Sequence, residues 1–275
     1  MRVPRIKCRR PGFRWYDPLM WRGQAVLCNP LLGKLIGLTT GNVIRRGACS
    51  IDTGSDWIES ATKARLFWGF YEDYELDFVR RYLPGDLDVV ELGSSIGVLS
   101  SHIAQRLLPE RTLVCVEPNP HLIAVLDSNI RRNAPNSITR LLNIAVDYSG
   151  GAEVPLSISF NTAWSKVDIA RRELAGECVI VKAKTLSAIL TEAAISRYAL
   201  VCDIEGAEAG VIFADRAAFD GCQHIIIELH DTELQGRPVA VEESRKEIET
   251  VLGFTLIARR SNAFYFARPS ALIHR

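Results

Sequence analysis

The sequence of 275 residues contains no C-x-x-C pair, although it holds seven cysteines. Most of these cysteines lie inside apolar runs rather than in the closely spaced pairs that bind zinc or build a disulfide framework. The pattern therefore argues against a zinc site and against a disulfide-stabilised secreted scaffold. It is typical of a protein in a reducing compartment, and we expect a cytoplasmic location.

The chain also lacks a hydrophobic run long enough to cross a bilayer. The apolar residues 25–38 are interrupted by Asn29, Pro30 and Lys34, whereas a membrane helix needs about 20 consecutive apolar residues. We therefore expect no transmembrane segment. The sequence leaves open whether this stretch rests on a membrane surface and whether the chain forms a homo-oligomer.

An excess of one charge is missing too, since 33 Lys and Arg stand against 32 Asp and Glu. The exception is residues 1–14, whose six basic side chains all precede the first acidic residue, Asp17. This segment is expected to be a solvated terminus or, alternatively, to contact acidic lipid, polysaccharide or nucleic acid. No apolar run suited to a signal peptide follows it. Because clearly basic residues are confined to it, we expect no nucleic-acid partner.

Apolar residues make up 48% of the chain, which is enough for a sizeable core. The length predicts one large domain with an extension. Residues 1–60 are rich in Arg, Gly and Pro without periodicity, and we take them as an N-terminal extension with a hairpin around Thr53-Gly54. It could serve as a lid, a dimer contact or a substrate element. Residues 61–275 form the folded domain.

From residue 70 onward, helical and strand patterns alternate. Helices are expected over 70–83 and 97–108, after Asn119 as N-cap, and after Thr185 as N-cap. Buried strands are expected over 87–92, 112–117, 141–146, 200–204 and 224–229. This alternation predicts an α/β fold with a doubly wound, mostly parallel, Rossmann-like sheet. The last two strands, joined at Ser261-Asn262, form an antiparallel hairpin instead.

The segment VVELGSSIG at 89–97 has a strand, a glycine turn and a helix start. It lacks the G-x-G-x-x-G fingerprint of nicotinamide enzymes, because Ser95 takes the second glycine position and Gly97 falls one residue early. Gly93 allows close backbone approach to a ligand, while Glu91 would repel a pyrophosphate. A cationic ligand end fits this loop better. Glu117, which ends the next strand, is placed to accept hydrogen bonds from a ribose.

A second group of polar residues follows two later strands. Asp203, Glu205 and Glu208 crowd the turn in LVCDIEGAE (200–208), and Glu228 and His230 end the next strand. Like charges this close imply a cation, a metal or a proton-transfer role. We predict that Asp203, Glu205 and His230 are catalytic, with His230 the proton acceptor near neutral pH, and that Glu208 only complements the helix dipole. Asp203 and Glu228 holding a divalent metal is a less favoured alternative.

The chain resembles the FkbM family of S-adenosylmethionine-dependent methyltransferases over about residues 66–268. The resemblance rests on Gly69, Tyr71 and Glu72, on ELGSSIG, on VEPNP at 116–120, on Asn143 with Ala145, on KTLSAIL at 184–190, and on DIEGAE.

This resemblance implies a class I methyltransferase fold and an O-methyltransferase. The cofactor would be S-adenosylmethionine, released as S-adenosylhomocysteine, and the acceptor a hydroxyl of a saccharide or another natural product. Glu91, Gly93, Ser95 and Gly97 would then hold the amino-acid end of the cofactor and Glu117 its ribose, without a metal.

The resemblance also suggests positions for the remaining residues. Asn143 and Ala145 would border the adenine of the cofactor, and Tyr71 and Glu72 would line the acceptor pocket. Two alternatives stay open: an NAD(P)-dependent oxidoreductase, and a non-catalytic nucleoside-binding module.

Overall fold

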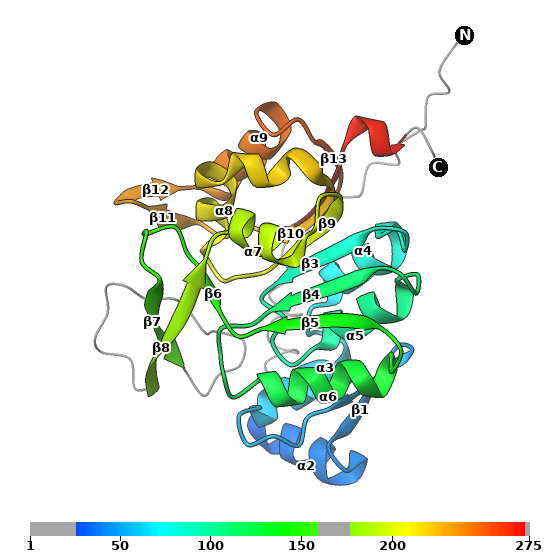
Figure 1. Cartoon of the computed structure of the whole chain (residues 1–275). Helices are drawn as coiled ribbons and strands as arrows, with labels where there is room; N and C mark the ends of the chain where they lie inside the picture. Colours follow the sequence, from blue (N-terminus) through cyan, green and yellow to red (C-terminus); the bar gives the residue numbers. More distant parts are fainter. Residues whose placement is uncertain (1–25, 159–176, 273–275) are drawn as a thin grey trace.

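The computed structural model describes residues 26–158 and 177–272 (Figure 1). Its centre is a seven-stranded sheet in the order β13-β14-β10-β9-β3-β4-β5. In that order the strands are Thr255–Arg260, Ala263–Ala267, Cys222–Glu228, Tyr198–Cys202, Asp88–Leu92, Thr112–Val116 and Ile138–Leu142. Only β14 runs antiparallel to its neighbours. The predicted doubly wound sheet with a final antiparallel hairpin is confirmed.

Helices cover both faces of the sheet because its central strands are apolar on both sides. The helices α4 (Asp73–Tyr82), α5 (Val98–Arg106) and α6 (Ile123–Asn133) share one core with alternate residues of β3 and β4. On the other face, α7 (Leu186–Ala193), α8 (Glu208–Ala214) and α9 (Val241–Thr250) share a second core. This two-faced burial is what continuous apolar strands require.

Smaller elements surround the central sheet. β6 (Ala145–Val146), β8 (Glu177–Lys184) and β7 (Glu153–Ile158) form a three-stranded sheet beside it (Figure 1). The other small elements are the hairpin of β11 (Thr232–Leu234) and β12 (Arg237–Val239) and two 3₁₀ helices, Arg216–Gly221 and Pro269–Leu272. In the part of the chain that the structure describes, no helix has the length and hydropathy needed to cross a bilayer.

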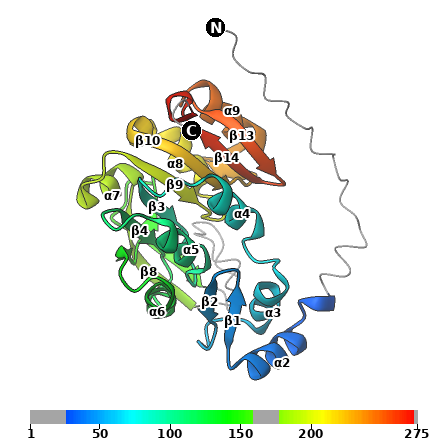
Figure 2. The same ribbon diagram turned by 90° about the vertical axis from the view of Figure 1, so that its right-hand side faces the viewer.

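The described part of the extension consists of α2 (Pro30–Thr40) and the hairpin of β1 (Val43–Arg46) and β2 (Cys49–Asp52), and α3 (Ser60–Trp68) follows it. Figure 2 shows this blue segment beside α3. Its apolar side chains form one buried cluster that also includes Ile96, Val98 and Leu122 of the larger domain. The basic residues 1–14 lie outside the described residues.

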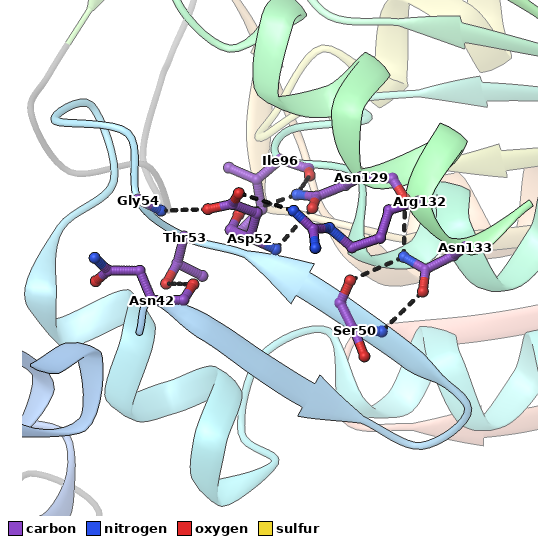
Figure 3. A network of polar contacts seen from close by, with 9 residues as sticks. All are labelled: Asn42, Ser50, Asp52, Thr53, Gly54, Ile96, Asn129, Arg132 and Asn133. Carbon is purple, nitrogen blue, oxygen red and sulfur yellow. Dashed lines mark hydrogen bonds and ion pairs between the residues drawn. The ribbon is translucent and has the colours of Figure 1, made fainter. Parts of the chain in front are cut away.

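Side chains of α6 bind the edge of β2 (Figure 3). Asn129 accepts the Asp52 N–H at 2.7 Å and donates to the Asp52 carbonyl at 3.1 Å. Asn133 does the same with Ser50, at 2.8 and 3.0 Å. Each asparagine thus satisfies a backbone donor and acceptor on β2, as a neighbouring strand would. Arg132 adds an ion pair with the Asp52 carboxylate.

Three sequence predictions about local structure are wrong. The hairpin turn lies at Gly47-Ala48, between β1 and β2, and not at Thr53-Gly54. The helix expected to begin after Asn119 begins at Ile123. Asn119 instead closes a turn, since its side chain accepts the His121 N–H at 3.0 Å.

The third error concerns the strand expected over 141–146. β5 ends at Leu142, and Ala145 and Val146 pair with β8 in the smaller sheet. The break falls at Asn143, whose side chain donates to the carbonyl groups of Glu117 and Pro118, at 2.9 Å each. The helix capped by Thr185 is confirmed, with its hydroxyl accepting the Ala188 N–H.

Candidate functional site

The turn after β3 has an unusual backbone. Gly93, Ser95 and Gly97 have φ values of +87°, +46° and +82°, a region that glycine enters without strain. A Cβ atom on Gly93 would lie 1.8 Å from the carbonyl oxygen of Asp203. The turn after β3 therefore presses directly against the turn after β9, which brings two of the predicted motifs into contact.

Glu117 fixes the other side of this turn. One of its carboxylate oxygens accepts the Ser95 N–H and the other accepts the Asn119 N–H, each at 2.8 Å. Burial raises the pKa of Glu117 to about 7. Each oxygen keeps a second lone pair for a ligand hydroxyl, so the hydrogen bonds found here are compatible with the predicted ribose contact.

The two residues predicted to line the acceptor pocket lie beside the same turn. The Tyr71 hydroxyl is 3.0 Å from the Ser95 hydroxyl, and Glu72, at φ +49°, immediately precedes α4. Burial raises the pKa of both side chains well above their ordinary values.

Four carboxyl groups line one small cavity next to Gly93. They belong to Glu72, Glu75, Glu91 and Asp203. The Oε2 atom of Glu72 and the Oδ1 atom of Asp203 are buried without a hydrogen-bond partner, whereas Glu91 accepts the Ser100 hydroxyl at 2.5 Å. A positively charged ligand beside this cavity would stabilise the ionised form of these carboxyl groups.

The pKa values of these groups follow from the same environment. Burial raises the pKa of Glu91 to about 7. Burial, together with the charge of Glu228, raises the pKa of Glu75 to about 7 and that of Asp203 well above its ordinary value. Sequence reasoning missed Glu75. Its one available signal was its position three residues after Glu72 on an expected helix, where two side chains share a face.

His230 joins the acids of the β9 turn, as predicted. Its Nδ1 atom lies 3.2 Å from Glu208 Oε1 and its Nε2 atom 3.8 Å from Glu205 Oε2. Burial lowers the pKa of His230, but the hydrogen bond to Glu208 and the charges of Glu208, Glu228 and Asp203 outweigh it and raise the pKa to about 9. The imidazole is therefore protonated at neutral pH, which does not fit its predicted role as the proton acceptor.

Glu208 is more than a residue that complements a helix dipole. Its side chain is 1% exposed and accepts the N–H groups of Ile204 and Gly206 besides contacting His230. Atoms of Asp203, Glu208 and His230 that could ligate a metal lie within 4.8 Å of one another. Glu228, the predicted metal partner of Asp203, is not part of that group.

Of the two residues predicted to border the adenine, Asn143 lies beside Glu117, whereas Ala145 packs away from this cluster. Asn143 is exposed and holds the chain segment after β4. Ala145 is 1% exposed and packs with Val154 and Val181 in the core of the smaller sheet. The structure therefore gathers the residues around Gly93, Glu117, Asp203 and His230 at one sheet edge, with Asn143 next to it.

The fold and the site define a class I, Rossmann-like methyltransferase. The features that define it are the mostly parallel seven-stranded sheet with an antiparallel strand next to its edge, the glycine turn after β3 and the buried acid after β4. The model of the methyltransferase FkbM domain matches residues 92–256, more than half of the chain, and the chain belongs to this family. S-adenosylmethionine as cofactor is consistent with that membership.

Comparison with solved structures finds only distant similarity. A Rossmann-superfamily protein from Streptococcus agalactiae has 12% identity and a TM-score of 0.39, over 70% of this chain and 65% of that one, just under two thirds of its length. Fibrillarin from Aeropyrum pernix, with bound S-adenosylmethionine, has 14% identity and a TM-score of 0.37, over 67% of each chain.

A candidate O-methyltransferase from Klebsiella pneumoniae has 13% identity and a TM-score of 0.41, over 71% of this chain and 77% of that one. Among curated proteins, no sequence match is found.

Proposed function

We propose that the protein transfers the methyl group of S-adenosylmethionine to a hydroxyl group of a saccharide or another natural product. The observation that carries this proposal is the acidic cavity between the turns after β3 and β9, with two unpartnered carboxylate oxygens. Glu91, on one side of this cavity, would face the cationic end of the cofactor, while Asp203 and His230 at the same sheet edge would handle a hydroxyl proton.

The residues present fit this cofactor. Bound S-adenosylmethionine supplies a methyl group already activated by its sulfonium. Glu91, Gly93, Ser95 and Gly97 would hold its amino-acid end, because backbone can approach closely there and the nearby charges are negative. Glu117 would accept the ribose hydroxyls.

The remaining parts of the site follow from position. Asn143 and the backbone near Ala145 would border the adenine. Tyr71 and Glu72 would line the acceptor side. The residues on the cofactor side and on the acceptor side would act mainly by aligning the methyl group with the acceptor hydroxyl and by excluding water from the site.

Asp203 is the better base for the acceptor. Its Oδ1 atom has no hydrogen-bond partner and borders the cavity. Burial raises its pKa and so makes its ionised form a stronger base than an ordinary aspartate. Protonated His230, with a ring nitrogen within 4.8 Å of the carboxyl group, would favour that ionised form. Oδ1 would take the hydroxyl proton as the acceptor oxygen is methylated. His230, which carries its own proton, would with Glu205 orient the acceptor and balance the negative charge.

The test is a methyl-transfer assay with labelled S-adenosylmethionine, a panel of saccharides and hydroxylated aromatic compounds, and amine analogues of each. We expect a methyl ether and S-adenosylhomocysteine as products. Asp203→Asn should lower kcat roughly 10²- to 10⁴-fold, the usual contribution of a general base, while calorimetry shows little change in cofactor affinity. Asp220→Asn, at an exposed aspartate of the 3₁₀ helix before β10, is the matched control.

Other outcomes would change the proposal. A methylated amine with no ether product would contradict the acceptor class, and an unchanged rate in Asp203→Asn would remove Asp203 as base. We expect full activity in chelator. Its loss, restored by Mg²⁺, would place a metal at Asp203, Glu208 and His230 instead.

A further inference from the structure

The helix α2 turns its leucines toward solvent. Leu31, Leu35 and Leu38 are 79%, 55% and 82% exposed, and their spacing of four and three residues places them in one row. Helices of globular proteins normally bury such a row against the core. This orientation leaves an apolar strip on the surface of the molecule.

The packing of α2 on α3 explains why the leucines face outward. Gly33, Ile36 and Gly37 form the buried side of α2. A Cβ atom on Gly33 would lie 1.6 Å from the Ser60 carbonyl oxygen, so the two backbones touch through a glycine. The close-packed glycine side therefore fixes the rotation of α2, and the leucine row has no part in holding the fold.

Exposed aromatic side chains also lie at the end of α3 and just after it. Phe67, Trp68 and Phe70 are 46%, 44% and 42% exposed. The Trp68 indole N–H donates to the Leu27 carbonyl at 3.1 Å, which joins this end of α3 to the segment that precedes α2. We call the exposed side chains of Leu31, Leu35, Leu38, Phe67, Trp68 and Phe70 the α2 patch. Apolar patches of this kind mark interaction surfaces.

We infer that the α2 patch docks on an anionic lipid bilayer. The described helix carries no acidic residue, and Lys34 is exposed within the leucine row. Residues 1–25, which precede the helix, hold in their sequence one acid, Asp17, and seven basic residues: Arg2, Arg5, Lys7, Arg9, Arg10, Arg14 and Arg22. An exposed apolar helix face that directly follows a basic segment in the sequence is the composition that binds acidic lipid.

Charge also disfavours a second copy of the chain as the occupant, because pairing two α2 patches would bring two such basic segments together.

The geometry of binding follows from the helix length. The 11 residues of α2 span roughly 16 Å at 1.5 Å per residue, about half of the hydrocarbon thickness of a bilayer. The helix would therefore lie in the plane of the lipid headgroups with its leucines inserted.

The test is flotation of the full chain with vesicles of phosphatidylcholine alone and with phosphatidylglycerol added. We expect binding to the anionic vesicles that weakens as salt is raised. The double variant Leu35→Glu/Leu38→Glu should lower the partition coefficient about a hundredfold, since inserting each leucine contributes about a factor of ten. Its thermal unfolding and its affinity for S-adenosylmethionine should match the unmodified chain.

Val251→Glu is the matched control, because Val251 is 50% exposed at the end of α9, and α9 and α2 lie at opposite ends of the molecule (Figures 1 and 2). It should bind vesicles like the unmodified chain. Failure of the unmodified chain to float with anionic vesicles overturns the inference. So does binding that the leucine variant retains, which would assign it to the basic residues alone. A dimer in light scattering that the leucine variant abolishes, without vesicle binding, would point to a second copy instead.

Discussion

The pair of His230 and Glu208 shows how single residues set the charge of the site. Glu208 accepts the backbone N–H groups of Ile204 and Gly206, and its Oε1 atom lies 3.2 Å from Nδ1 of the imidazole. This contact, rather than exposure to water, keeps a proton on His230. Because the imidazole is charged at neutral pH, our proposal places the base among the carboxylates, and Asp203 Oδ1, like Glu72 Oε2, is buried without a hydrogen-bond partner.

Replacing Glu208 should release that proton. In Glu208→Gln we expect the pKa of His230, followed by NMR, to fall from about 9 toward the ordinary 6.5. Glu205→Gln is the control and should lower it less, since Glu205 Oε2 is 3.8 Å away. A raised folded-state pKa stabilises the protein fully below the unfolded pKa and less as pH rises through the folded pKa. Stability should therefore decline between about pH 6.5 and 9 in the unmodified chain, and this decline should shrink in Glu208→Gln. Equal shifts in both variants would contradict the assignment.

Sequence reasoning could bring Asp203 and His230 together because parallel strands end at the same edge of a sheet, so residues just after them converge. It could not select Glu75 and Glu208. Both lie on helices, where the direction of a side chain depends on how the helix packs, and that is decided by contacts distant in sequence. The surroundings of Ala145 could not be derived for a similar reason, because the direction of its side chain depends on which sheet its short strand joins.

Among the elements, the turn after β3 is the one whose shape depends most on a single residue type. Gly93→Ala should destabilise the fold by about 2–4 kcal/mol, combining the cost of positive φ with displacement of the Asp203 loop. Gly150→Ala is the control, since Gly150 has φ +88° with nothing within 4 Å, and should cost about 1–2 kcal/mol. Urea unfolding measures both. Equal losses would show that contact between the two turns contributes nothing.

The order of elements was predictable because buried parallel strands and amphipathic helices leave different periodicities. The end of β5 was not. LLNIAV reads as one apolar strand, yet β6 pairs with β8, whose residues 177–184 come more than thirty positions later. A local pattern cannot report which sheet a strand joins, because that choice depends on partners distant in sequence. The turn of the β1–β2 hairpin was misplaced within a segment that has no periodicity to fix its register.

At the scale of the whole molecule, the described part of the extension and the methyltransferase domain share one core. The division of the chain into an extension, residues 1–60, and a domain, residues 61–275, remains a proposal that rests on the sequence pattern. Ile44 and Ile51 nevertheless pack in the same buried cluster as Ile96, which lies within the glycine turn. Asn129 of α6 joins the same three parts, because its side chain bonds Asp52 of β2 and donates to the Ile96 carbonyl at 2.8 Å (Figure 3).

Asn129→Ala should therefore weaken stability and cofactor binding together. Asn129 is fully buried, and its loss leaves the Asp52 N–H and the Ile96 carbonyl unsatisfied, which costs about 2–4 kcal/mol. We expect one cooperative unfolding transition at lower urea and severalfold weaker binding of S-adenosylmethionine by calorimetry. Arg132→Ala removes only the partly exposed ion pair to Asp52 and should cost about 0–1 kcal/mol. Two separate transitions in Asn129→Ala would show that the extension is an independent unit, because a shared core requires both parts to unfold at once.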